Sequence, residues 1–252
     1  MTTTKGKLNE RFLQQDFGNS VIFSGELEKF RMLASGYAQI ENAIAVLSDL
    51  KERKSNIFYG GMAQVLGMSP KGQCCIVDSI WEEEIFKAIS ANDLERKHLD
   101  ELKFIHFLKN RPADRLTDYC LTNILSIKGS DGREYRVCHR VFYVGVEPNG
   151  SIRLALCLYN LTDDKGGTDS FIRDTNSGKT YSIEQQDFNN LLSRREKEVL
   201  ALIKQGLTSK QISKDLSISL YTVSRHRQNI LSKLRATNSI DACRIAKQLE
   251  LI

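Results

Sequence analysis

Residues 219–235 constrain the fold most, because they read as one long two-faced helix, SLYTVSRHRQNILSKLR. At 100° per residue, an apolar face and a polar face lie about 130° apart. The apolar face comprises Leu220, Val223, Ile230, Leu231 and Leu234. The polar face comprises Tyr221, Ser224, Arg225, Gln228 and Ser232. Because this polar face has few carboxylates and several hydrogen-bond donors, it suits a helix that enters the major groove of DNA.

The charge of the chain is unevenly distributed, and this supports the same interpretation. Residues 191–252 contain twelve Lys or Arg and five Asp or Glu, a net charge of +7. Since the 252-residue chain has a net charge of +5, the remainder has −2. A basic module attached to a near-neutral larger part is typical of a protein that binds a polyanion. Charge alone would also fit an ordinary solvated face.

The C-terminal segment also shows clear signals for helix ends. Ser193 with Glu196, and Thr208 with Gln211, fit the capping-box pattern at two helix starts. Gly206 is placed to end the first of these helices. Ser219 is the expected cap of the long helix, and a fourth helix is expected from Asn238 or Ser239. A short helix, a tight turn and a longer helix with a polar face make a helix-turn-helix.

This segment closely resembles the LuxR/FixJ-type helix-turn-helix. The matching residues are 192–200, 206–212, 216–219, Thr222, Val223, His226, Asn229, Ile230, Lys233 and Leu234. The resemblance implies a compact four-helix unit whose third helix enters the major groove and whose fourth often pairs with a second subunit. Ser213 departs from the family, which usually has a small apolar residue there.

Matching by position then assigns expected roles in DNA binding. The candidates for contacts to base edges are Ser224, Arg225 and Gln228, since Arg can read guanine and Gln can read adenine. The candidates for phosphate contacts are Thr208, Ser209, Lys210, Tyr221, Arg227 and Lys233. A solvated helix flank is the alternative for Arg227 and Lys233. His226 lies at the edge of the apolar face and is expected to be structural.

The larger N-terminal part predicts an α+β domain. Strands are expected at 44–48, 56–59, 120–127, 135–146 and 152–161, and Gly-bearing turns separate the last three. A short helix is expected over 25–34, before the first strand. Further helices are expected between the second and third strands, the longest capped by Asn92 and ending near Lys109. We therefore expect a five-stranded antiparallel sheet with helices on one face.

This order of strands and helices resembles a PAS domain, which would imply sensing or dimerisation. The expected organisation is a loose or partly helical arm over 1–20, a PAS-like domain over 21–165, a linker with a possible hairpin over 166–190, and the helix-turn-helix domain over 191–252. The fold class is thus α+β at the N-terminus and an all-α four-helix domain at the C-terminus.

No catalytic residue, metal site or cofactor is predicted. The six cysteines form no C-x-x-C pair, and no histidine lies at zinc-finger spacing from them. His106 and His139 lack a recognisable set of metal ligands in the sequence. His98 could line a pocket or bind haem, but a core histidine is the simpler interpretation. Nucleotide-binding and hydrolase motifs are absent from the sequence.

These observations favour a DNA-binding transcription regulator controlled by a small molecule or a partner. The expected partners are double-stranded DNA and a second copy of the chain, with RNA polymerase and an unknown small-molecule ligand as further candidates. No signal peptide or membrane span is recognised, so a cytosolic protein without a membrane partner is expected. The alternatives are a sigma-like factor and an enzymatic N-terminal domain fused to a DNA-binding module.

Overall fold

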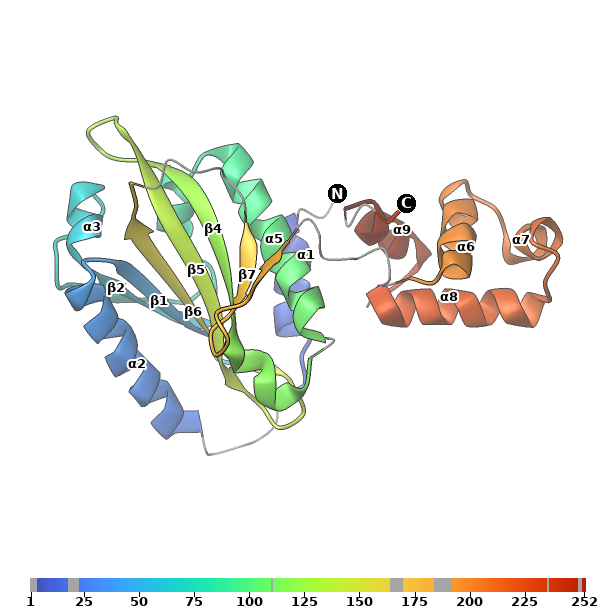
Figure 1. Cartoon of the computed structure of the whole chain (residues 1–252), viewed down its shortest axis with the longest axis horizontal. Helices are drawn as coiled ribbons and strands as arrows, with labels where there is room; N and C mark the ends of the chain where they lie inside the picture. Colours follow the sequence, from blue (N-terminus) through green and yellow to red (C-terminus); the bar gives the residue numbers. More distant parts are fainter. Residues whose placement is uncertain are drawn as a thin grey trace. The chain divides into compact units, whose positions relative to one another are not determined.

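The computed structural model describes residues 4–17, 23–109, 111–163, 170–183, 192–234, 236–248 and 251–252. The chain forms two compact units, Met1–Ile183 (unit 1) and Glu184–Ile252 (unit 2) (Figure 1). Unit 1 contains a mixed arrangement of helices and one large sheet, and unit 2 is helical.

Unit 1 is built on an antiparallel sheet that has eight strands among the described residues, in the order β3-β2-β1-β6-β5-β4-β7-β8. The strands are β1 (Ile44–Asp49), β2 (Lys54–Tyr59), β3 (Cys74–Val77), β4 (Tyr119–Lys128), β5 (Glu134–Val146), β6 (Ile152–Leu161), β7 (Phe171–Asp174) and β8 (Thr180–Ser182). The long strands β4, β5 and β6 pair along most of their length, which places the centre of the sheet there.

The prediction of a five-stranded sheet is wrong in number. The five predicted strands form the contiguous block β2-β1-β6-β5-β4, and three short strands extend it at both edges. One of these, β3, has four residues, too few to show an alternating pattern. The other two, β7 and β8, form the hairpin expected within 166–190, and β7 pairs with β4 as an extension of the sheet.

The expectation of helices on one face of the sheet is wrong, because helices cover both faces. The helices of unit 1 are α1 (Thr4–Leu13), α2 (Phe23–Ile40), α3 (Gly61–Val65), α4 (Glu83–Ala88), α5 (Ala91–Lys109) and the 3-10 helix η1 (Ala113–Asp118). Ile44 and Val46 face the larger core with α1, α4 and α5, whereas Ala45 and Leu47 face α2. Figure 1 shows α2 on one side of the sheet and α5 on the other. No helix in the described ranges is long and apolar enough to cross a membrane.

Two predicted helix boundaries are corrected. Helix α5 begins at Ala91, so Asn92 is not its cap; the Ser90 hydroxyl instead accepts the Asp93 N–H at 3.2 Å. Helix α2 extends to Ile40, beyond the short helix expected over 25–34. The longer α2 gains its buried contacts from Ala34 and Ala38, small residues that let the helix lie close to the sheet.

The first helix is part of the core of unit 1. Leu8 is fully buried and Phe12 is nearly so. The indole N–H of Trp81 donates to Asn9 at 3.0 Å, and the Phe12 ring lies against Trp81 with centroids 6.1 Å apart. Within the expected arm over 1–20, the described residues are therefore a helix that closes one side of the core.

Unit 2 contains four helices among the described residues, and its hydrophobic core is separate from that of unit 1. The helices are α6 (Arg194–Lys204), α7 (Ser209–Asp215), α8 (Leu220–Leu234) and α9 (Ser239–Gln248). Both predicted capping boxes are present. Ser219 Oγ accepts the Thr222 N–H at 3.0 Å, and Gly206 has the left-handed φ of 87° expected after a helix end.

Glu196 joins the start of α6 to α8. Its carboxylate is buried and accepts hydrogen bonds from the Ser193 N–H and the Lys233 ammonium, each at 2.7 Å. Burial by itself raises the pKa of Glu196, but the Lys233 ammonium and the Ser193 bonds outweigh it and hold the pKa below its ordinary value. The ionised carboxylate therefore stabilises the folded unit.

We predict that Leu8→Ala lowers the free energy of unfolding of unit 1 by about 2–5 kcal/mol, because it leaves a cavity at a fully buried position. Glu10→Ala, at an exposed position of the same helix, is the control and should cost less than about 0.5 kcal/mol. Trp81 is the single tryptophan of the chain, so its fluorescence in a urea titration reports on unit 1. Equal urea midpoints of unfolding for the two variants would show that the packing of α1 does not stabilise unit 1.

We predict that the stability of unit 2 falls between neutral pH and about pH 3, in part because Glu196 takes up a proton on unfolding. Since its folded pKa is lowered, its contribution is present above the ordinary Glu pKa and is lost as the pH falls through the folded value. Glu196→Gln should cost about 1–3 kcal/mol at neutral pH and flatten the pH dependence. The measurement is urea unfolding followed by the NMR amide signals of Val199 and Ile230.

The control for this experiment is Asp215→Asn, which removes an exposed carboxylate at the end of α7. It should leave the pH dependence as in the unchanged chain. If the free energy of unfolding of Glu196→Gln changes with pH as steeply as that of the unchanged chain, the assigned role of this carboxylate is wrong.

Candidate functional site

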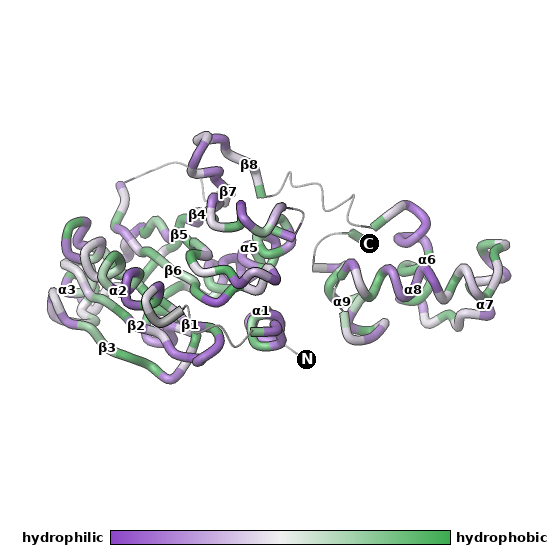
Figure 2. The backbone as a smooth tube through the Cα atoms, turned by 90° about the horizontal axis from the view of Figure 1, so that it is seen from below, coloured by the Kyte–Doolittle hydropathy of each residue, from purple (hydrophilic) through white to green (hydrophobic). Residues whose placement is uncertain are grey.

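The two-faced helix predicted at 219–235 is α8, and its faces are largely as expected. Val223, Ile230 and Leu234 are buried against the other helices of unit 2. Ser224, Arg225 and Gln228 are exposed. Figure 2 shows hydrophilic and hydrophobic residues alternating along this helix. One detail differs: Leu220, expected on the apolar face, is half exposed at the first turn of the helix.

The turn between α7 and α8 fixes the direction in which α8 leaves the unit. Ser217 has a left-handed φ of 52°, which lets the chain reverse within a few residues. The Ser213 hydroxyl donates to the Ile218 carbonyl at 2.6 Å. This bond accounts for a serine at the position where the resemblance predicted a small apolar residue, because the hydroxyl satisfies a carbonyl of the turn.

The phosphate-contact candidates divide into two groups. Thr208, Lys210 and Tyr221 are exposed. Ser209, Arg227 and Lys233, of which Lys233 is also exposed, bond to other helices of unit 2, although these bonds do not exclude a further contact. Arg227 donates to Ser209 at 3.1 Å and to Ser239 at 3.0 Å, which ties α8 to the starts of α7 and α9. Lys233 pairs with Glu196. All six stay predictions as DNA contacts.

A second candidate site lies in the core of unit 1, where polar side chains gather beneath α5. We call it the buried polar cluster: Glu82, Lys97, Asp100, Glu101, Asn123 and His139, each at most 3% exposed. Buried ionisable groups are costly unless they are paired, so such a set is either a tightly bonded scaffold or a binding site. The structure shows features of both.

An ion pair within α5 is the centre of this cluster. The Lys97 ammonium donates to Glu101 at 2.8 Å, one helical turn away, and both side chains are almost fully buried. Burial by itself lowers the pKa of Lys97, but Glu101 and Glu82 hold it above its ordinary value. Lys97 is therefore a permanent positive charge in the interior.

A row of polar side chains crosses the sheet below this pair, and its middle members, His139 and Tyr159, are joined by a ring contact. In the strand register, Asn123 of β4 lies opposite His139 of β5, which lies opposite Tyr159 of β6. The Asn123 amide donates to Asp100 at 2.9 Å, and its oxygen lies 3.3 Å from Nδ1 of His139. At the other end, the Tyr159 hydroxyl donates to Glu82 at 2.5 Å. The row links three strands to α5 and to the segment before α4.

Several polar atoms in this region have no hydrogen-bond partner among the described residues, including Nε2 of His98, Nε2 of His139 and the Tyr143 hydroxyl. Burial, reinforced by the nearby Lys97 charge, lowers the pKa of His98 to about 3. Burial also lowers the pKa of His139 well below its ordinary value. Both rings are neutral at physiological pH. The atoms without a partner can therefore form a hydrogen bond to a water molecule or bind a ligand at this place.

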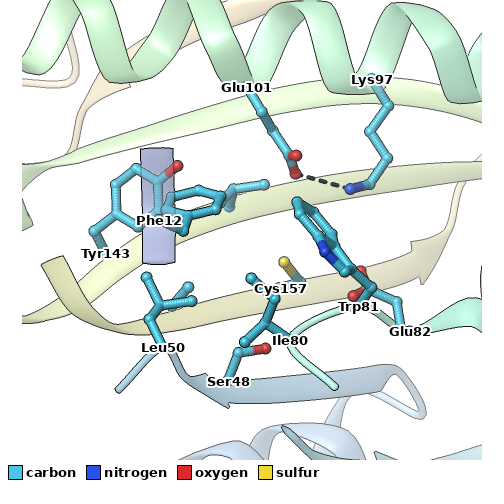
Figure 3. A pocket seen from close by; sticks show the side chains of 12 residues that line it. Phe12, Ser48, Leu50, Ile80, Trp81, Glu82, Lys97, Glu101, Tyr143 and Cys157 are labelled. Carbon is cyan, nitrogen blue, oxygen red and sulfur yellow. Dashed lines mark hydrogen bonds and ion pairs between the residues drawn. The ribbon is translucent and has the colours of Figure 1, made fainter. Parts of the chain in front are cut away.

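A small cavity of about 20 Å³ lies next to this row. Its walls come from α1, α5, three strands and the segment before α4, and include Glu82, Lys97, Glu101, Tyr143 and Cys157. Figure 3 shows the Lys97–Glu101 pair above the sheet, with Cys157 below it and Trp81 at the side. The volume admits about one water molecule.

Sequence reasoning missed the buried polar cluster. Its members lie far apart in the chain, and strand alternation does not distinguish a buried histidine from a buried leucine. Lys97 and Glu101 at i,i+4 look like an ordinary exposed ion pair in the sequence. His139, for which no set of metal ligands was visible, lies beside Glu82 and Cys157 in the fold.

Residues 190–246 match the family model for bacterial regulatory proteins of the luxR family. Response regulator protein TmoT of Ectopseudomonas mendocina is 39% identical over 59 residues, 23% of this chain and 27% of that one. Transcriptional regulatory protein LiaR of Bacillus subtilis (strain 168) is 41% identical over 61 residues, 24% and 29% of the two chains. The chain thus spans about a quarter of the length of these curated relatives.

Solved structures give weaker likenesses over more of the chain. The crystal structure of a phage VqmA–DPO complex shares 16% identity and covers 90% of this chain and 94% of that one, with a TM-score of 0.32. Escherichia coli SdiA shares 14% identity over 99% and 97% of the two chains, with a TM-score of 0.28. TM-scores this low do not establish a common fold. What the match and the geometry establish together is that unit 2 carries a LuxR-type helix-turn-helix domain.

Proposed function

We propose that this protein is a sequence-specific DNA-binding transcription regulator, in which unit 2 reads double-stranded DNA and unit 1 controls it. The observation that supports this most is the exposed polar face of α8 in a domain of the LuxR type. The sigma-like alternative needs a second helical DNA-binding region upstream, and unit 1 is instead built on a sheet. No observation favours an enzymatic unit 1.

Base reading is assigned to Ser224, Arg225 and Gln228. They lie on consecutive turns of the exposed face of α8, so one helix can present all three to a major groove. Arg can bind guanine with two hydrogen bonds and Gln can do the same with adenine, so these two side chains are expected to set the preferred sequence.

Phosphate binding is assigned first to Thr208, Lys210 and Tyr221, since these side chains are exposed. Ser209, Arg227 and Lys233 are proposed to act mainly by holding α8 against the rest of the unit, with contacts to the backbone of the DNA as a second role. The two roles can be distinguished by how DNA affinity depends on salt concentration. Removing a charge that neutralises a phosphate makes the affinity less dependent on salt, whereas removing a charge that only holds α8 in place does not.

Unit 1 is proposed to be a PAS-like sensing and dimerisation domain. In support, the five strands expected from the PAS resemblance form one contiguous block, with α4 and α5 across one face. The buried polar cluster lies between that face and α5, where a signal could act. A cavity of about 20 Å³ is far below the roughly 300–1,000 Å³ of ligand pockets, so an organic ligand would have to open it.

A second copy of the chain is the proposed partner of α2. Its outward face has three large exposed apolar side chains, Met32 (65%), Leu33 (54%) and Ile40 (81%). Their spacing of i, i+1 and i+8 places them on one stripe. A homodimer would bury this stripe and pair two DNA-reading helices on two half-sites.

We predict that Arg225→Ala and Gln228→Ala each cost about 1–3 kcal/mol of specific binding and relax the preference at one base position. Sites are first selected from random duplexes with the unchanged chain, and affinities are then measured by fluorescence anisotropy at fixed salt. Arg194→Ala is the matched control, since it removes the same charge from a 95% exposed side chain on α6. Unchanged sequence preference in both α8 variants would overturn the base-reading assignment.

We predict that the chain sediments as a dimer and that Leu33→Glu shifts it toward monomer, because burying a carboxylate in an apolar contact is costly. Sedimentation velocity at micromolar concentration measures the distribution. Gln64→Glu, an exposed position on α3, adds the same charge away from α2 and should sediment as the unchanged chain. A dimer that Leu33→Glu leaves intact would place the interface elsewhere.

A further inference from the structure

Three potential metal ligands meet in the core of unit 1. Glu82 comes from the segment before α4, His139 from β5 and Cys157 from β6. Each offers one ligand atom, and these atoms all lie within 4.8 Å of one another. The three residues are 3%, 0% and 8% exposed, so this is not an accidental surface grouping. Carboxylate, imidazole and thiolate are the ligand types that proteins use for zinc and related metals.

The hydrogen bonds around His139 leave one ring nitrogen for such a role. Because the Asn123 amide nitrogen donates to Asp100 and to Ser170, its oxygen is turned toward Nδ1 of His139. An amide oxygen only accepts, so Nδ1 has the proton. Nε2 is then an unprotonated nitrogen, fully buried, without a partner among the described residues. A histidine held through one nitrogen by a polar group and open at the other is the usual arrangement of a metal ligand.

The balance of buried charge also favours a cation. Counted formally, the ammonium of Lys97 is the one positive charge in the cluster against the carboxylates of Glu82, Asp100 and Glu101, which leaves two negative charges without a counterpart there. A divalent cation bound with Cys157 as a thiolate reduces this excess to one negative charge. A thiol binds such a metal as the thiolate, so binding at Cys157 releases the thiol proton.

Space for a fourth ligand adjoins two of the three residues. The cavity of about 20 Å³ is lined by Glu82 and Cys157, and it can hold a water molecule as a fourth ligand. Figure 3 shows Glu82 and Cys157 in its wall. Bonds of about 2.0–2.3 Å to the metal would draw the three side chains slightly together.

We propose that Glu82, His139 and Cys157 form a binding site for one divalent transition-metal ion of the zinc class, inside the sheet–helix core of unit 1. The metal joins β5 and β6 to the segment before α4, and Asn123 positions the histidine. This inference does not depend on the proposed function, because metal binding and DNA binding are measured separately on the same sample.

The experiment uses the full chain in a Cys74→Ser, Cys75→Ser background, so that these surface-accessible neighbouring thiols do not contribute. After treatment with a chelator, the protein is dialysed against Zn²⁺ and, separately, Co²⁺. We expect one metal ion per chain and, with Co²⁺, a thiolate-to-metal charge-transfer band in the near ultraviolet together with visible d–d bands. Cys157→Ser should remove the charge-transfer band, and Glu82→Gln and His139→Gln should weaken metal binding at least about 10-fold.

Cys120→Ser is the matched control, since Cys120 is a buried thiol of β4 that faces the other side of the sheet. It should keep the band. Asn123→Ala should weaken metal binding by about 10–100-fold without removing the band, as expected for a positioning residue. Circular dichroism and Trp81 fluorescence show whether each variant is folded. Failure of the folded parent chain to take up stoichiometric Zn²⁺ or Co²⁺, or a band that survives in Cys157→Ser, would overturn the proposal.

Discussion

The packing of α8 is the constraint on which the function of unit 2 depends. Val223, Ile230 and Leu234 must be buried for the four helices to share a core, and a helix buried on one side must expose the other. Glu196 and its bonds to Ser193 and Lys233 tie α8 to the start of α6. Together these contacts hold one polar face outward on a rigid support, which is what reading base edges requires.

The core of unit 1 differs from that of unit 2 because it contains a cluster of polar and charged side chains. Its interior contains an ion pair, a neutral histidine and a row of polar side chains across three strands, whereas well-packed apolar residues in such places are often at least as stable. Polar groups retained at such a cost, with some left unpartnered, are expected where something binds. A sensing domain needs such a place, and a site inside the core can pass a change in its occupancy to α5 and to the sheet.

The sequence predicted unit 2 better than unit 1, and the reason is physical. The capping residues and the apolar stripe of unit 2 are patterns within a few residues of sequence. Ser193, Thr208 and Ser219 could therefore be predicted as helix caps from their close neighbours. Unit 1 depends on contacts between distant residues. The five longer strands were predicted from β-rich runs bounded by turns, but β3 is too short to stand out, and the β7–β8 hairpin was expected only as part of the linker. The convergence of Glu82, His139 and Cys157 is set by strand register, which no local pattern reports.

Chemical protection of DNA by the full chain is the most direct test of the account. On a selected site, dimethyl sulfate reacts with N7 of guanine in the major groove, where Arg225 is proposed to bind. We predict protection of guanines in two half-sites about 10–10.5 base pairs apart, or a multiple of that spacing, and loss of this protection at the same positions in Arg225→Ala. A specific complex that leaves every major-groove guanine of its site reactive would contradict the account.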